Sequence, residues 1–268
     1  MRAVGMFRGL TAAVIAFLLV LPAPVSAQRD DSRSRRDGGH VAGVFDHYVL
    51  ALSWSPTHCA EADPRESNDP QCAPRPPRPY AFVLHGLWPQ YEQGWPEFCR
   101  IAERPFVPER LIGDMLDIMP SRKLVIHQYR KHGTCSGLSP QAYFDLSRRI
   151  FETVKIPERF VRPAAPFTIG RNEVIDAFKE ANPKLARDMI AVTCGGSGPR
   201  LQEVRICFSR DGEPRSCGAS LDQRRLCRAD RLFVPPVRGG DGASGGAAAP
   251  TAPQPLPPGL MPGDGRRL

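Results

Sequence analysis

The chain has 268 residues, of which 41% are hydrophobic and 24% charged, with 8 cysteines and a formal net charge of +8. A positive charge suits a polyanionic substrate, but a solvated arginine-rich surface explains it equally well, so charge alone identifies no partner. No two cysteines have the C-x2-C spacing, which argues against a zinc site and favours disulfides in an exported protein.

The N-terminus has the features of a secretory signal peptide over residues 1–27. Arg2 and Arg8 precede an apolar run over residues 10–21, and small residues follow before Gln28. Twelve apolar residues are too few to span a bilayer, which takes about 20, so a short membrane anchor is the weaker alternative. We therefore expect an exported protein, periplasmic or extracellular, with a net charge of +6 and no stable membrane association after signal cleavage.

Two segments flank the expected domain. Residues 28–40 are polar and charged, which predicts a flexible N-terminal segment. Residues 235–268 are rich in Gly, Ala and Pro and have too few large apolar side chains to offset the entropy of ordering, which predicts a disordered tail. Residues 41–234 remain and suffice for one domain.

The first part of this domain predicts two strands. Residues 45–54 are rich in β-branched and aromatic side chains and end before Pro56. Residues 80–84 form a second apolar run, which would present His85 at its end. The polar, proline-rich residues 60–79 between the two strands predict a loop.

Helices are predicted in the middle of the chain, from apolar residues at helical spacing and from proline or serine at the helix starts. They are expected over residues 109–118, 139–151 and 172–181. A further helix is expected around the second histidine block described below, and either Gly133 or Gly137 would end it.

The last third of the domain predicts strands again, over residues 190–194, 201–208 and 231–234. Strands at both ends with helices between them indicate an α+β fold. We expect a single domain with a central, mostly antiparallel sheet, packed against several helices and stapled by disulfides.

Two short blocks hold three of the six histidines. They are F-V-L-H-G-L-W-P-Q at 82–90 and H-Q-Y-R-K-H-G-T-C at 127–135. On a helix, the second block presents two imidazoles, an amide and an ammonium group within an arc of about 140°. These side chains belong to His127, Gln128, Lys131 and His132.

This helix face suits a phosphate better than a metal ion. His127 and His132 are five residues apart and out of line for zinc, and no third ligand has a suitable spacing. His85 would face them, because Gly86 permits a sharp bend after the strand. Two histidines at one phosphate can act as general acid and general base near neutral pH.

RNA is one of several phosphoesters that such a site could cleave, since its 2′-hydroxyl supplies the nucleophile. Trp88 offers a flat face for a nucleobase, although core packing is an equally good reading of it. The remaining histidines, His40, His47 and His58, are expected to be surface or hydrogen-bonded core residues.

The two blocks resemble the two signatures of the ribonuclease T2 family, the base-nonspecific endoribonucleases of secretory and acidic compartments. The first signature, H-G-L-W-P, is matched in full at 85–89. The second, H-E-aromatic-x-K-H-G-x-C, is matched at 127–135 except that Gln128 stands in place of the glutamate. Weaker similarities at 52–56, 119–121 and 201–207 extend the resemblance over about 45–234.

The resemblance implies a role for each residue of the blocks. His85 would donate a proton to the leaving 5′-oxygen, and His132 would take the proton of the 2′-hydroxyl. Lys131 and His127 would bind the phosphate, and Trp88 would contribute to a base pocket. Single-stranded RNA would be cut by transesterification to a 2′,3′-cyclic phosphate and then a 3′-phosphate, with little base specificity. We expect no metal or other cofactor and a monomeric protein.

The disulfide pattern of the family also implies four disulfides in this chain, namely Cys59–Cys72, Cys99–Cys135, Cys194–Cys227 and Cys207–Cys217. Gln128 neither titrates nor carries a charge, so we expect activity to persist with a pH profile unlike that of relatives with glutamate. A weakened relative that only binds RNA and a metal-dependent phosphodiesterase are the alternatives.

Overall fold

Six strands form one sheet in the part of the chain that the computed structural model describes, which is residues 39–62, 70–73, 76, 78–196 and 198–238. The strands are β1 (His47–Trp54), β2 (Phe82–Gln90), β3 (Phe167–Gly170), β4 (Ile190–Gly195), β5 (Arg200–Phe208) and β6 (Arg231–Val234). Their order is β2-β1-β5-β6-β3, with β4 also paired to β5. Every pairing is antiparallel except the short contact between β5 and β6.

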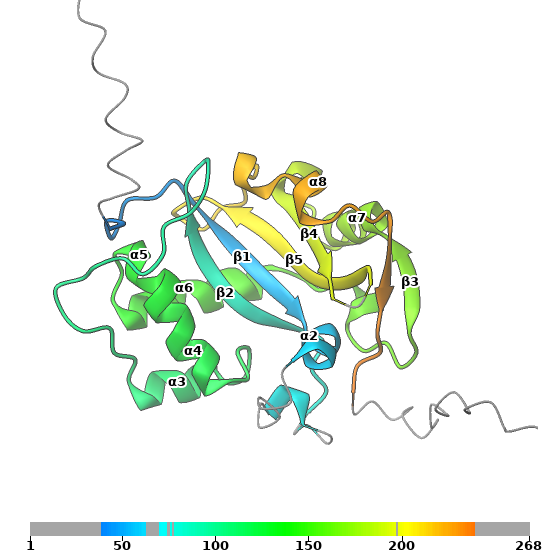
Figure 1. Ribbon diagram of the computed structural model, residues 1–268, viewed down its shortest axis with the longest axis horizontal. Coiled ribbons are helices and arrows are strands. Elements are labelled where there is room, and N and C mark those ends of the chain that lie inside the picture. The colour runs from blue at the N-terminus through cyan, green and yellow to red at the C-terminus, as the bar shows by residue number, and fades with distance from the viewer. Residues whose placement is uncertain (1–38, 63–69, 74–75, 77, 197, 239–268) are drawn as a thin grey trace, which may run out of the picture. The chain divides into compact units, whose positions relative to one another are not determined.

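The helices gather mainly on two parts of this sheet (Figure 1). Those beside β1 and β2 are α3 (Glu109–Met115), α4 (Arg122–Gln128), α5 (Thr134–Ser136) and α6 (Pro140–Thr153). The others are α2 (Ser55–Glu61) at the end of β1, α7 (Arg171–Ala181) against β3 and β4, and α8 (Gln223–Leu226) against β4. A π-helical turn, Tyr129–Gly133, joins α4 to α5.

The α+β fold with a mostly antiparallel sheet is confirmed. Helix α6 begins as predicted, because the Ser139 side chain accepts a hydrogen bond from the Ala142 N–H at 3.2 Å. Strand β3 and helices α2 and α8 were not predicted. They have 4, 7 and 4 residues, which is too short to show a clear period, and Pro56 starts a helix as well as ending a strand.

The two faces of β1 differ in side-chain size. Leu50, Leu52 and Trp54 are fully buried in the main hydrophobic core, and each such side chain stabilises the fold by roughly 1.5–3 kcal/mol. Ala51 and Ser53 alternate with them and lie on the other face. That face carries the histidine of the first block.

The four disulfides pair Cys59 with Cys72, Cys99 with Cys135, Cys194 with Cys227 and Cys207 with Cys217. These are the pairs that the family resemblance implies. The second of them ties residue 99 to the end of the helical segment that carries the second histidine block.

The described chain continues beyond the last predicted strand. The Trp54 side chain donates a hydrogen bond to the Pro235 carbonyl at 3.2 Å, and the buried Val237 donates its N–H to the Pro163 carbonyl at 3.0 Å. The predicted signal peptide, and the predicted tail from residue 239 onward, lie outside the described residues. Among the described helices, none is long and apolar enough to cross a bilayer.

Candidate active site

His85 lies in the middle of β2, at a β-bulge. Ala51 of β1 pairs with Gly86 and Leu52 pairs with Leu84, so His85 is the extra residue on β2. The prediction that the strand ends at residue 84 and that Gly86 bends the chain is therefore wrong. The bulge re-aims the histidine side chain within a continuous strand, as bulges often do beside active sites.

Trp88 connects the two sequence blocks. Its indole N–H donates a hydrogen bond to Gln128 Oε1 at 2.8 Å. Its ring stacks on the His132 ring, with centroids 5.2 Å apart, and meets the His85 ring edge-on at 5.1 Å. These contacts engage much of the half-buried indole within the protein, which gives Trp88 a clear packing role besides any contact with a base.

His132 is buried in this cluster, with 6% of its surface exposed, and its Nδ1 has no hydrogen-bond partner among the described residues. Burial, assisted by the positive charges of Lys131, His85 and His127, lowers the pKa of His132 to about 3. The imidazole is therefore neutral at physiological pH and can accept a proton.

The helix that carries the second block is not a regular α-helix. The Thr134 N–H donates to the Tyr129 carbonyl five residues earlier, which defines a π turn over Tyr129–Gly133. A π turn uses more residues than an α turn, so it draws His127 and His132 closer to one side than the 100° spacing predicts. The helix continues through Gly133 and ends at Gly137, whose φ is 75°.

His127 and Lys131 form the more exposed part of the cluster. The Lys131 ammonium lies 3.4 Å from the Glu97 carboxylate and 6.0 Å from the centre of the Phe98 ring. Burial and the charges of Lys131 and His85 lower the pKa of His127. The predicted stripe is thus present, with Gln128 and His132 turned inward onto Trp88 and the other two residues beside them.

Gly86 is required by close packing. A Cβ atom at this position would lie 2.2 Å from Gln128 Oε1 and 2.5 Å from Trp88 Nε1, which is closer than real Cβ atoms approach. Any side chain at position 86 would therefore separate the indole from the amide.

Two further residues of the site, Glu203 and Arg205 of β5, were missed at the sequence level. Glu203 Oε1 lies 2.6 Å from His85 Nδ1. The guanidinium of Arg205 donates two hydrogen bonds to Glu203 Oε2, at 2.9 and 2.7 Å, and lies 5.0 Å from the centre of the Trp88 ring. Their spacing of two residues on a strand, which puts both on one face, was the available signal.

A cavity of about 430 Å³ opens beside His85. It is lined by β1, α2, β4, β5 and α8 and includes Glu203, Arg205 and Thr193. His58 also lines it, although no pattern in the sequence indicated that this histidine lies near the site.

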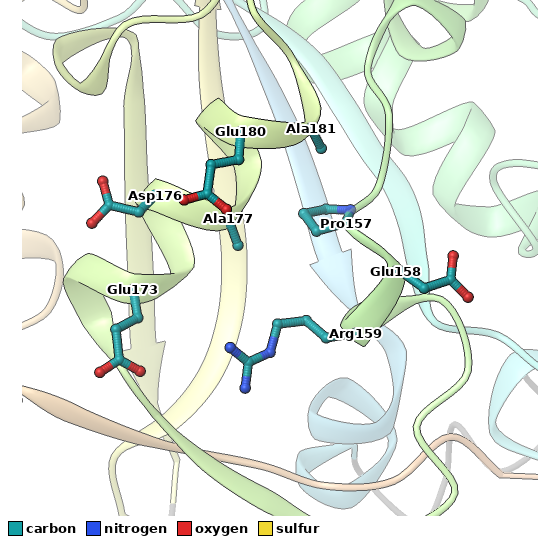
Figure 2. Close-up of a pocket in the computed structure, with 8 residues that line it drawn as sticks. All are labelled: Pro157, Glu158, Arg159, Glu173, Asp176, Ala177, Glu180 and Ala181. Carbon is teal, nitrogen blue, oxygen red and sulfur yellow. The ribbon is translucent and has the colours of Figure 1, made fainter.

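A different cavity, of about 500 Å³, lies between α7 and the turn Glu158–Phe160 and contains no histidine (Figure 2). Four of its eight lining residues are acidic: Glu158, Glu173, Asp176 and Glu180. A polyanionic substrate would be repelled there. No group of three or more His, Cys, Asp or Glu side chains suited to a metal ion occurs among the residues that the structure describes.

The sequence model of the ribonuclease T2 family matches residues 45–217. A ribonuclease from Aeromonas hydrophila is 42% identical over 197 residues, which are 69% of this chain and 82% of that protein. Ribonuclease I of Escherichia coli strain K12 is 27% identical over 231 residues, which are 72% of this chain and 86% of that protein.

Solved structures of similar fold include an RNase-related protein from Calystegia sepium, with a TM-score of 0.55 and 20% identity. The match covers 72% of this chain and 98% of that one. A variant of ribonuclease MC1 in complex with 5′-UMP gives a TM-score of 0.54 and 22% identity, covering 70% of this chain and 97% of that one. At these identities the likeness supports the fold.

Proposed function

Because the chain belongs to the ribonuclease T2 family and is a ribonuclease of that type, we propose that it is an exported endoribonuclease that cleaves single-stranded RNA without a metal ion and with little base specificity. The observation that carries the proposal is the joint packing of His85 and His132 against Trp88, beside two further basic groups. This arrangement holds two proton-transfer groups and the cations that a phosphodiester requires.

The first step forms the cyclic phosphate. Neutral His132 takes the proton of the ribose 2′-hydroxyl, and the 2′-oxygen attacks the phosphorus. The P–O5′ bond breaks, and His85 gives its proton to the leaving 5′-oxygen. The incoming phosphate is an anion, which favours the protonated form of His132 and so makes it a stronger base in the complex than in the free protein.

The second step hydrolyses the cyclic phosphate to a 3′-phosphate, with the two histidines exchanging roles. Lys131 and His127 stabilise the extra negative charge on phosphate in both transition states. Trp88 holds His132 and Gln128 in place and borders the space for a base. Gln128 supplies a neutral acceptor to the indole.

Cleavage of poly(U) in excess EDTA tests this function. We expect the wild-type protein to release cyclic-phosphate products and the variant His85→Ala to release none. Intact RNA with the wild-type protein would favour an RNA-binding relative, and activity lost only on chelation would favour a metal-dependent phosphodiesterase.

The substitution Gln128→Glu is expected to move the acid limb of the pH–rate profile to higher pH. An ionised carboxylate one helical turn from His132 would raise the pKa of that histidine, so a higher pH would be needed to free the base. The wild-type protein should accordingly remain active at lower pH than the variant. Matching profiles would show that position 128 has no electrostatic role.

Gln141→Glu is the matched control for this experiment. It makes the same chemical change at an exposed position of α6. There Gln141 accepts a hydrogen bond from Arg110 and donates one to Asp145. We expect its profile to coincide with that of the wild-type protein.

Export is proposed from the predicted signal peptide together with the four disulfides, which form and persist in oxidising compartments. The proposed location of the mature protein is the periplasm or the extracellular space. We propose a monomer with RNA as its partner and without stable membrane association.

A further inference from the structure

The Nδ1 atom of His85 contacts a carboxylate that lies outside the two histidine blocks. We propose that Glu203, held by Arg205, is a positioning residue for His85 that fixes the orientation of its ring and the nitrogen that carries the transferred proton. This inference rests on the proposed role of His85 as the acid of RNA cleavage.

The contact defines the hydrogen-bonding state of the imidazole. A carboxylate oxygen only accepts, so His85 Nδ1 must carry a hydrogen to bond Glu203 Oε1 at 2.6 Å. The other ring nitrogen, Nε2, is then the one available to the substrate. A side chain that can rotate about two bonds is thereby held in one orientation.

Glu203 is itself fixed. Its side chain is 10% exposed, and its second oxygen accepts both hydrogen bonds from the Arg205 guanidinium. Burial acts to raise the pKa of Glu203, but the hydrogen bond and charge of His85 and the charge of Arg205 outweigh it and lower the pKa to about 2. The Glu203 carboxylate therefore stays ionised at neutral pH.

The sheet is shaped for this contact. Strand β1 lies between β2 and β5, where Ala51 pairs with both Gly86 and Arg205 and Ser53 pairs with Glu203. Cross-strand partners share a face of the sheet, so these two small side chains stand under the contact. They leave room for the His85 and Glu203 side chains to meet above β1.

The effect of losing the Glu203 contact is expected to depend on the leaving group of the substrate. When the P–O5′ bond breaks, the proton moves from His85 Nε2 to the 5′-oxygen, and the neutral imidazole keeps its Nδ1 hydrogen on Glu203. A ring that is not held spends part of its time with the wrong nitrogen facing the substrate. Only a reaction that needs this proton should be slowed.

Two substrates separate this role from a structural one. Uridylyl-3′,5′-adenosine has an alkoxide leaving group that must be protonated, whereas uridine 3′-(4-nitrophenyl phosphate) releases a phenolate that is stable as the anion. We expect Glu203→Gln to lower kcat for the dinucleotide by about 10- to 100-fold. The aryl ester should lose at most about threefold, because the base and the cations remain in place.

Glu152→Gln is the matched control. Glu152 of α6 also accepts a hydrogen bond from an arginine, Arg148, at 3.4 Å, and it does not line the cavity beside His85. We expect it to cleave both substrates at the wild-type rate. Equal losses on the two substrates in Glu203→Gln, or no loss on either, would overturn the inference.

The reference variant is His85→Ala, which should show the same selectivity more strongly. If His85→Ala were unselective, the proposed role of this histidine would fail, independently of Glu203. If Glu203→Gln did not fold, as judged by thermal melting, Arg205→Gln would serve instead. A smaller selective loss there supports the inference, and an unselective one contradicts it.

Discussion

The substitution His132→Asn is expected to reduce the rate of RNA cleavage by a factor of about 10³, within the range of 10²–10⁴ that a general base contributes. Binding of RNA should be weakened far less, because Lys131 and His127 remain. The measurement is kcat for a dinucleotide substrate together with the affinity for an uncleavable 2′-deoxy analogue.

The free energy of unfolding of the same variant should also depend less on pH. Relative to the wild-type protein, the variant should be more stable at acid pH than at neutral pH. The pKa of His132 is lowered to about 3 in the folded state, against about 6.5 in the unfolded chain. Between these values the unfolded state binds the proton and the folded state does not, so wild-type stability falls as the pH falls from 6.5 towards 3. At pH 4.5 this proton uptake lowers the free energy of unfolding of the wild-type protein by up to about 2–3 kcal/mol, and the variant without the histidine avoids that loss.

Chemical denaturation at pH 7.5 and 4.5 measures the difference, and His47→Asn is the control. His47 is fully buried, and burial, with the charge of Arg215, lowers its pKa. It lies outside the cluster, so this variant should gain relative acid stability and keep its activity. If both variants keep their activity, His132 is not the base.

The substitution Gly86→Ala is expected to lower kcat by about 10²-fold while leaving the fold intact. The new methyl group would overlap Gln128 Oε1 and Trp88 Nε1, so the indole and the amide must move apart. Because Trp88 stacks on His132 and touches His85, a displacement of about 1 Å would misplace both, and errors of that size cost about 10²-fold. Overpacking should also cost about 1–3 kcal/mol of stability.

Gly113→Ala makes the same change in helix α3, where an added Cβ meets nothing within 4 Å. A helical glycine replaced by alanine gains roughly 0.5–1 kcal/mol, so this control should be slightly more stable and fully active. Comparable rates for the two variants would show that the packing at position 86 is unimportant.

Most of the candidate site could be predicted because its residues lie in two contiguous blocks with recognisable spacing. Regular helical spacing placed Gln128 and His132 in one stripe, and the structure sets both against Trp88. The fold class followed from the order of strand-like and helix-like segments, which is a coarse property and survives errors at individual boundaries.

The errors arose where tertiary contacts override a local pattern. Gly86 looks like a bend in sequence, yet it is a strand residue kept small by the side chain of Gln128. The π turn depends on a hydrogen bond between Tyr129 and Thr134 that no residue type announces. Glu203 and Arg205 lie more than a hundred residues from His85, and only the pairing of β1 with both β2 and β5 joins them.

Strand β1 supplies no proton and no charge to the proposed reaction. Its contribution is that the side chains of Ala51 and Ser53 are small, so that residues of the two neighbouring strands can contact each other across it. Natural selection would preserve the small size of the side chains at these two positions rather than their polarity. A search for reactive side chains would pass over both of them, although the acid side of the site depends on the space that they leave empty.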